Sequence, residues 1–211
     1  MVTDINGFLE YRAAQGGRGA TWYPAHDLAS LYKGCDYDAF GCLFGVRNYA
    51  NFRPLAAYRG LPGDVSGSVS VRSAQLTEWY GEGGFHDTTW ITWAEVKAID
   101  WDERAEKPDS RLHQYRRTPD GLRFSGKASW SREFAEAVDL GPGEVRLAPG
   151  EAREWPEGSE WLVGDTLYRS VTLRRGDAVP ESEWQPVWKA METLAAQHGD
   201  DNVRLVVWFD S

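Results

Sequence analysis

Hydrophobic residues recur along the chain with two different spacings, which predict where strands and helices form. Apolar and polar residues alternate at residues 4–12 and 167–173, the period of a strand with one buried face. Residues 203–210 are apolar at positions facing both sides, so we expect a strand buried on both faces. The N- and C-terminal strands are therefore predicted to lie in the core sheet.

Helical spacing occurs in other segments, and several carry a signal at one end. Asp36 is a suitable N-cap for the first helix. Thr92 with Glu95 forms a capping box that opens a short helix, and Gly199 supplies the stop after the last helix. The longer predicted helices cover residues 37–46, 70–80, 131–138 and 183–198.

The middle of the chain has a different character. The turn sequence T-P-D-G between two strand-like runs predicts a hairpin over residues 112–126. Pro, Gly and Glu dominate residues 141–160, which are predicted to be loop with a short strand near 145–147. We interpret residues 105–165 as a possible insertion or subdomain.

The order of the predicted elements indicates the fold class. Strands and helices mix without a regular βαβ alternation, which favours an α+β fold. We therefore expect a single compact domain over residues 1–211, with a mixed or antiparallel sheet and helices packed on it.

Charge narrows the classes of function. The net charge is −9, and an acidic surface repels phosphate groups, so we expect neither nonspecific nucleic-acid binding nor membrane binding. Two interpretations of the acidity stay open. Either the acidic surface mimics DNA and so occupies a DNA-binding protein, or it keeps a protein with eleven Trp soluble.

Localisation and cofactors follow from what the chain lacks. We find no signal-peptide pattern near the start and no apolar run long enough to span a bilayer, so a cytoplasmic location is expected. Cys35 and Cys42 match no metal pattern and are expected to be free thiols. The four histidines show no metal-binding spacing, so we expect no metal site and no cofactor.

One polar grouping in the first half is the main candidate for a ligand site. Two guanidiniums with an imidazole can bind a phosphate or carboxylate and transfer a proton near neutral pH. The alternative is that Arg47 and Arg59 pair with carboxylates such as Glu10 or Asp64 and brace the irregular loop. The members of this grouping are Arg47, Asn48, Arg59, His86 and Asp87.

Neighbouring residues extend this candidate site. His86 and Asp87 are the candidate catalytic pair, as general base and orienter, although they also suit a loop leading into the helix at Thr92. Trp90 is either a stacking surface for a ligand or part of the core. Asp4 and Asn6 are added as ligand-binding candidates because they could meet His86 in space.

Five short segments occur one after another along the chain: DINGFLEYR, YDAFGCLFGVRN, YRGLPGDVS, FHDTTWITWAEV and the final VRLVVWFD. In this order they resemble an uncharacterised family of phage and prophage proteins. The resemblance covers about the first hundred residues and the last ten. It implies a cytoplasmic accessory role linked to phage or mobile elements, and it supplies no reaction.

Two departures from the family pattern concern histidines. Members typically open with a Met-Gly-Cys-Asp-Ile-His-like segment and carry a His-Ser-His-Ser-Trp-Leu-Thr-like segment in the middle. This chain has Asn6 where the family usually has His, and Thr88 where a second His is common, while His86 is kept. A metal site built from those histidines is therefore not expected here.

Two classes of function stay open from the sequence. The first is a regulatory, inhibitory or sequestering protein that binds a partner protein or a small anionic ligand. The alternative is an enzyme acting on a nucleotide-like anionic substrate, with Arg47 and Arg59 as anion clamps and His86 as general acid or base.

Overall fold

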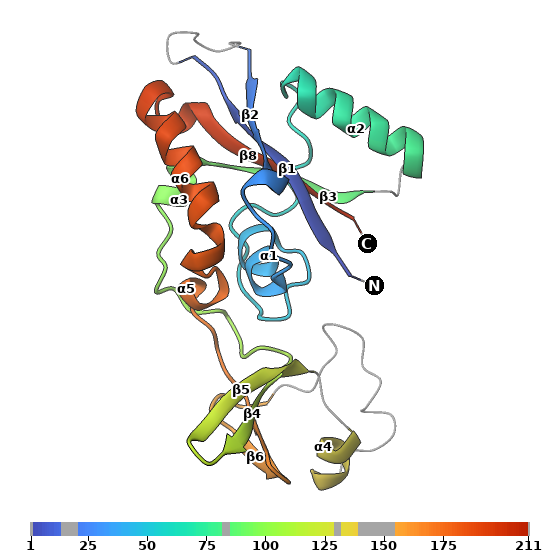
Figure 1. Ribbon diagram of the computed structural model, residues 1–211, viewed down its shortest axis with the longest axis vertical. Helices are drawn as coiled ribbons and strands as arrows, with labels where there is room; N and C mark the ends of the chain where they lie inside the picture. The colour runs from blue at the N-terminus through green and yellow to red at the C-terminus, as the bar shows by residue number, and fades with distance from the viewer. Residues whose placement is uncertain (1, 14–20, 82–84, 129–131, 139–154, 211) are drawn as a thin grey trace.

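The strands form two separate four-stranded sheets, where the sequence led us to expect one. The computed structural model describes residues 2–13, 21–81, 85–128, 132–138 and 155–210. Both sheets are antiparallel, and helices accompany each, so the α+β fold class is confirmed. The molecule is elongated, with the first sheet and most helices at one end and the second sheet at the other (Figure 1).

The first sheet has the strand order β2-β1-β8-β3. Every residue of β8 from Val203 to Phe209 is buried, which confirms a central strand covered on both faces. The N-terminal strand β1 pairs along its whole length with β8. The bounds are β1 Asp4–Tyr11, β2 Tyr23–Asp27, β3 His86–Thr92 and β8 Val203–Asp210. Strand β2 was not predicted, and β3 replaces the loop that we considered for His86 to Thr88.

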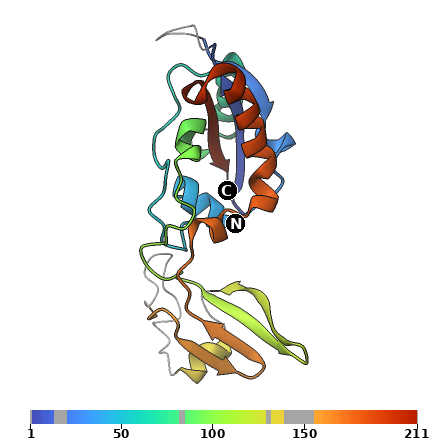
Figure 2. The same ribbon diagram turned by 90° about the vertical axis from the view of Figure 1, so that its left-hand side faces the viewer.

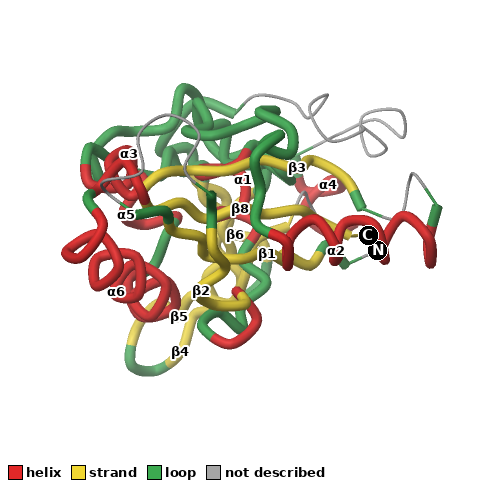
Figure 3. Tube along the Cα trace, turned by 90° about the horizontal axis from the view of Figure 1, so that it is seen from above, coloured by secondary structure: helices red, strands yellow, loops and turns green. Residues whose placement is uncertain are grey.

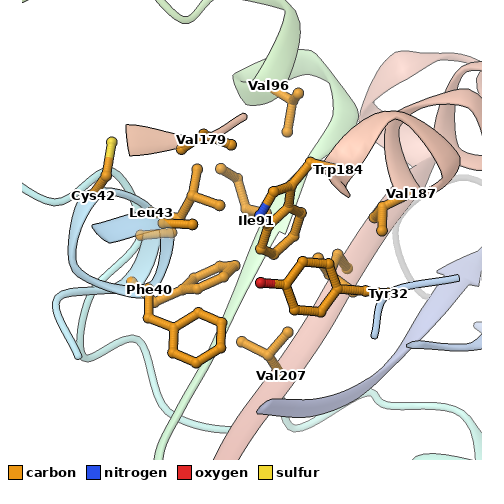
Figure 4. Close-up of a cluster of buried hydrophobic side chains, with 14 of the residues drawn as sticks. Tyr32, Phe40, Cys42, Leu43, Ile91, Val96, Val179, Trp184, Val187 and Val207 are labelled. Atoms are coloured by element: carbon orange, nitrogen blue, oxygen red, sulfur yellow. The ribbon is translucent and has the colours of Figure 1, made fainter. Parts of the chain in front are cut away.

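Helices cover both faces of the first sheet. On one face, α1 (Tyr37–Phe44) and α6 (Glu181–His198) enclose the main core, in which side chains such as Phe40 and Trp184 meet those of β8 (Figure 4). On the other face, α2 (Gly67–Tyr80) packs on Val206 and Trp208. Seen from above, α6 and α2 lie on opposite sides of the strands (Figure 3).

The predicted helix signals act as expected. The Asp36 carboxylate accepts a hydrogen bond from the Asp38 backbone N–H at 2.9 Å and caps α1. Thr92 and Glu95 make the reciprocal capping box of α3 (Trp93–Lys97). Gly199 follows α6 as its C-cap. The short helices α5 (Arg175–Ala178), η1 (Leu28–Ser30) and η3 (Asp200–Asn202) carried no signal that we recognised.

The second sheet has the order β5-β4-β7-β6 and contains the predicted hairpin. Its strands are β4 Leu112–Thr118, β5 Gly121–Ala128, β6 Glu160–Val163 and β7 Thr166–Arg169. Phe134 of α4 (Arg132–Ala137) packs on Tyr168 with ring centroids 4.7 Å apart. The strand predicted at 167–173 thus ends at Arg169, and the one near 145–147 lies outside the described residues. The proposed insertion at 105–165 contains β4, β5, α4 and β6.

The chain leaves the first sheet and returns to it as two adjacent segments. Arg104 and Arg174 form an antiparallel bridge, and the Ala105 N–H donates to the Leu173 carbonyl at 2.9 Å. Beside this junction, buried Asp109 accepts hydrogen bonds from Arg111, which also pairs with Asp38 of α1. This ion-pair cluster ties the second sheet to α1.

None of the described helices combines the length and the apolar character needed to cross a bilayer.

Candidate functional site

His86 and Asp87 form a side-chain pair although they are adjacent in sequence. The His86 Nδ1 and the Asp87 Oδ2 lie 2.8 Å apart. The pairing of β3 with β8 is interrupted by a bulge between His86 and Thr89, and Asp87 has a left-handed backbone with φ 51°. The bulge breaks the alternation that sends neighbouring strand side chains to opposite faces. It therefore allows the imidazole and the carboxylate to meet.

Arg47 is positioned at the end of α1 by two side chains. Its Nε donates to the Thr3 Oγ1 at 2.9 Å, and its guanidinium lies 6.0 Å from the centroid of the Tyr37 ring. The Tyr37 hydroxyl in turn accepts the Thr3 backbone N–H at 3.0 Å. The two terminal nitrogens of Arg47 have no hydrogen-bond partner within the described part of the chain.

Asn48 acts on the backbone rather than on a ligand. Its side-chain amide donates to the Phe52 carbonyl at 2.7 Å and accepts the Phe52 N–H at 3.0 Å. A Cβ on Gly41 would lie 2.7 Å from the Asn48 Cα, so the loop packs directly on α1. Asn48 therefore fixes the turn that holds Arg47 in place.

The end of β8 separates Arg47 from His86. The His86 ring stacks on Phe209 with centroids 6.4 Å apart, and Phe209 pairs on its other side with Ile5 of β1. Thr3, which holds Arg47, precedes Ile5 on the same face of β1 because strand side chains alternate. Strand β8 lies between β1 and β3, so Thr3, which holds Arg47, and His86 flank Phe209 from either side.

Asp4 and Asn6 lie on the opposite face. Asn6 is directly opposite Trp208, whereas His86 is opposite Phe209, and consecutive residues of β8 face opposite sides. The Asn6 amide contacts the Asp210 carboxylate at 3.4 Å. The sheet therefore does not bring Asp4 and Asn6 together with His86. Within the described ranges, no group of three or more His, Cys, Asp or Glu is arranged to hold a metal ion.

Arg59 is engaged in the interior of its own loop. Its two terminal nitrogens contact both carboxylate oxygens of Glu95 at 2.7 and 3.0 Å and also donate to the Leu55 and Trp90 carbonyls. The guanidinium lies 5.0 Å from the Trp90 ring centroid. Burial opposes ionisation of Glu95, but hydrogen bonds from Arg59 and from the Thr92 N–H outweigh it and lower its pKa. This geometry favours the bracing interpretation of Arg59.

The carboxylates that we considered as partners of Arg47 and Arg59 bind another arginine. Arg204 of β8 donates to Glu10 at 2.8 Å and to Asp64 at 2.9 Å. Glu10 and Arg204 are directly opposed in neighbouring strands and almost wholly buried. A charged residue inside each of two apolar strand patterns was the signal for this pair in the sequence.

Strained backbone concentrates around the candidate residues. Among the described residues, the non-glycine positions with left-handed φ lie in the loop after α1 or at the β3 bulge; they are Arg47, Asn51, Tyr58 and Asp87. Such conformations cost of order 1–3 kcal/mol each and cluster at ligand and catalytic sites. We therefore take Arg47, Tyr37, His86 and Asp87, with the buried Thr3 that holds Arg47, as the candidate site, and call it the strand-end site.

Comparisons with protein-family models, with curated proteins and with solved structures give no match to this chain. The function is therefore argued from the geometry of the strand-end site.

Proposed function

We propose that this protein is an accessory binding protein that holds a small anionic ligand at the strand-end site. The supporting observation is Arg47, a cation held at Nε by Thr3 while its terminal nitrogens have no partner in the described part of the chain. A guanidinium fixed in this way is prepared to bind a phosphate or carboxylate with two hydrogen bonds. The phage- or mobile-element-linked role rests on the family resemblance alone.

The position of Arg47 supports binding because it is maintained against two costs. Its left-handed φ of 52° is strained for a side chain with a Cβ. Its charge is also held by a hydroxyl and an aromatic ring rather than by a carboxylate, in a protein of net charge −9. An anionic ligand would complete the coordination of the guanidinium, and His86 stands on the other side of Phe209 to contact a longer ligand.

A thermal-shift screen tests this proposal. The compounds are inorganic phosphate, nucleotides, sugar phosphates and dicarboxylates, each added to the full chain. A ligand present at 100 times its Kd adds about 2.7 kcal/mol to the free energy of unfolding. We expect a stabilising compound whose effect is lost in Arg47→Gln.

Arg12 supplies a matched control. Its Nε also donates to a side-chain oxygen, that of Asn202 at 2.7 Å, and its guanidinium also lies over an aromatic ring, that of Trp22 at 4.9 Å. Arg12 follows β1 at the opposite end of that strand. Arg12→Gln should therefore keep the ligand effect. Equal loss in both variants, or no stabilising compound at all, would contradict a specific anion site at Arg47.

A second candidate function is supported by the His86–Asp87 pair. A carboxylate at 2.8 Å from Nδ1 orients the imidazole so that its other ring nitrogen can face a substrate, as a general base requires. The corresponding reaction is proton transfer on a nucleotide-like anionic substrate bound by Arg47. If the screen yields a ligand that is turned over, His86→Ala should abolish turnover while the urea unfolding curve is retained. Turnover that survives in His86→Ala would exclude this role.

A further inference from the structure

Strand β5 is an edge strand with an unusual surface. It stands at the end of the order β5-β4-β7-β6, so it pairs with β4 on its inner side, and no described residue pairs with its outer side. Leu122 is 50% exposed and Phe124 is 52% exposed, with exposed Arg123 between them. Soluble proteins normally protect an edge that carries exposed apolar side chains, because it accepts further strands. The hairpin of β4 and β5 (yellow-green) forms one margin of the second sheet (Figure 2).

The apolar side chains of β5 continue across the sheet. Directly opposed residues of antiparallel strands lie on the same face. Phe124 is opposite Tyr115, Tyr115 is opposite Leu167, and Leu167 is opposite Leu162, so one apolar row crosses all four strands. Leu162 at the far end is 51% exposed. This open face thus resembles the core of a protein interface more than an ordinary surface.

The other face of the hairpin carries opposed positive charges. Arg123 is directly opposite Arg116, and both side chains are exposed. No described carboxylate pairs with Arg116, Arg117 or Arg123. Like charges at directly opposed positions destabilise a strand pair. A carboxylate placed beside Arg123 would relieve this repulsion, so the margin is electrostatically complementary to an acidic partner.

We propose that the outer edge of β5 accepts an extended segment of an acidic partner protein as an additional strand. A strand that pairs with β5 continues its alternation, so residues opposite Leu122 and Phe124 share the apolar face and the residue opposite Arg123 shares the cationic face. The partner segment therefore alternates apolar with acidic residues. Main-chain hydrogen bonds supply the pairing, and the alternation supplies the specificity.

The same observations disfavour other occupants. A second copy of β5, paired antiparallel about Arg123, would oppose that arginine with its own copy. Single-stranded nucleic acid would stack bases on the rings of Phe124 and Tyr115, but the rest of the apolar face is aliphatic and offers no further ring for successive bases. An acidic polypeptide with apolar side chains matches both faces of the margin.

Short capped peptides added to the full chain test the proposal by fluorescence anisotropy. The probe alternates Val with Glu. One comparator has the same composition with all Glu residues at one end. A second carries N-methyl groups on the peptide amides that would face β5, so that they cannot donate to it. We expect the alternating peptide to bind at least roughly tenfold more tightly than either comparator, because only it can satisfy both faces and the backbone.

A charge exchange at Arg123 makes the test specific to this edge. Arg123→Glu should weaken binding of the Val-Glu peptide by at least roughly tenfold and should restore binding to a Val-Lys peptide. Arg53→Glu is the matched control, since it changes the net charge equally at an exposed position in the loop after α1, outside the second sheet. Urea unfolding establishes that both variants remain folded, and Arg123→Gln serves if Arg123→Glu does not.

Several results would overturn the proposal. Equal binding of the alternating and segregated peptides would indicate attraction to any anion. Equal weakening by Arg123→Glu and Arg53→Glu would indicate an effect of net charge. Tighter binding of an oligothymidine strand would make the margin a nucleic-acid surface, and a dimer lost in Arg123→Glu would identify a second copy as the occupant. Each of these results leaves the strand-end site and its Arg47 test unaffected.

Discussion

The replacement of Arg59 by Ala tests whether this residue braces the fold or binds a ligand. Its cost in free energy of unfolding can be worked out from the contacts of the side chain. The side chain contacts both oxygens of Glu95 and the carbonyls of Leu55 and Trp90. Glu95 belongs to the capping box of α3, so Arg59 connects the loop after α1 to that helix. The variant Arg59→Ala removes all of these contacts while leaving the α3 cap in place.

The loss in free energy of unfolding on Arg59→Ala depends on how far the side chains that it separates are exposed to solvent. The side chains of Arg59 and Glu95 are 25% and 41% exposed, so their bidentate pair contributes about 1 kcal/mol. Each carbonyl that loses its donor costs about 1 kcal/mol, and the contact with the Trp90 ring contributes about 0.5 kcal/mol. We therefore expect Arg59→Ala to lower the free energy of unfolding by about 3.5 kcal/mol. For a chain of this size that corresponds to a Tm lower by about 7–14 °C.

Urea unfolding followed by tryptophan fluorescence measures this change, with Arg53→Ala as the control. Arg53 is exposed in the same loop, and its replacement should change stability by less than about 0.5 kcal/mol. A double-mutant cycle with Glu95→Gln should give a coupling of about 1 kcal/mol. The reasoning is refuted if Arg59→Ala has native stability, and most clearly if it also removes the effect of a ligand found in the screen.

Three further predictions concern the core and the junction. Gly7→Ala would place a Cβ 2.2 Å from the Val206 carbonyl oxygen and should cost about 3 kcal/mol in urea unfolding, whereas Gly63→Ala, which meets nothing within 4 Å, should be nearly neutral. Burial alone would raise the pKa of Asp109, but hydrogen bonds from neighbouring His and Arg side chains hold it well below its ordinary value. Because the folded-state pKa is the lower one, this stabilisation is complete above about pH 4 and is lost as the pH falls further, and Asp109→Asn should reduce that acid dependence in unfolding measured against pH. Burial raises the pKa of Cys42 to about 11, so a thiol reagent at neutral pH should modify Cys42 only on unfolding, as read by mass spectrometry of the labelled peptides.

Local signals in the sequence identified several elements correctly because each acts over a few residues. The cap at Asp36, the box at Thr92 and Glu95, and the T-P-D-G turn depend on hydrogen bonds and dihedral preferences within one turn of chain. The apolar residues on both faces of 203–210 likewise indicated a central strand, since only a position between two covered faces buries both sets of side chains.

The partners of the charged residues depended on the tertiary structure. Arg59 is separated from Glu95 by 36 residues, and Arg204 from Glu10 by 194. The tertiary structure also separated residues that the sequence had grouped as one candidate site, since Asn6 and His86 fall on opposite faces of the first sheet.

By itself, the sequence determined the α+β class, the caps and the central position of the last strand, because these follow from the residue pattern within each element and the order of the elements. The tertiary structure alone decided that there are two sheets, that a bulge turns His86 towards Asp87, and which carboxylate each arginine meets. Those outcomes depend on strand order and register, and a shift of one residue in register moves every side chain of a strand to the other face.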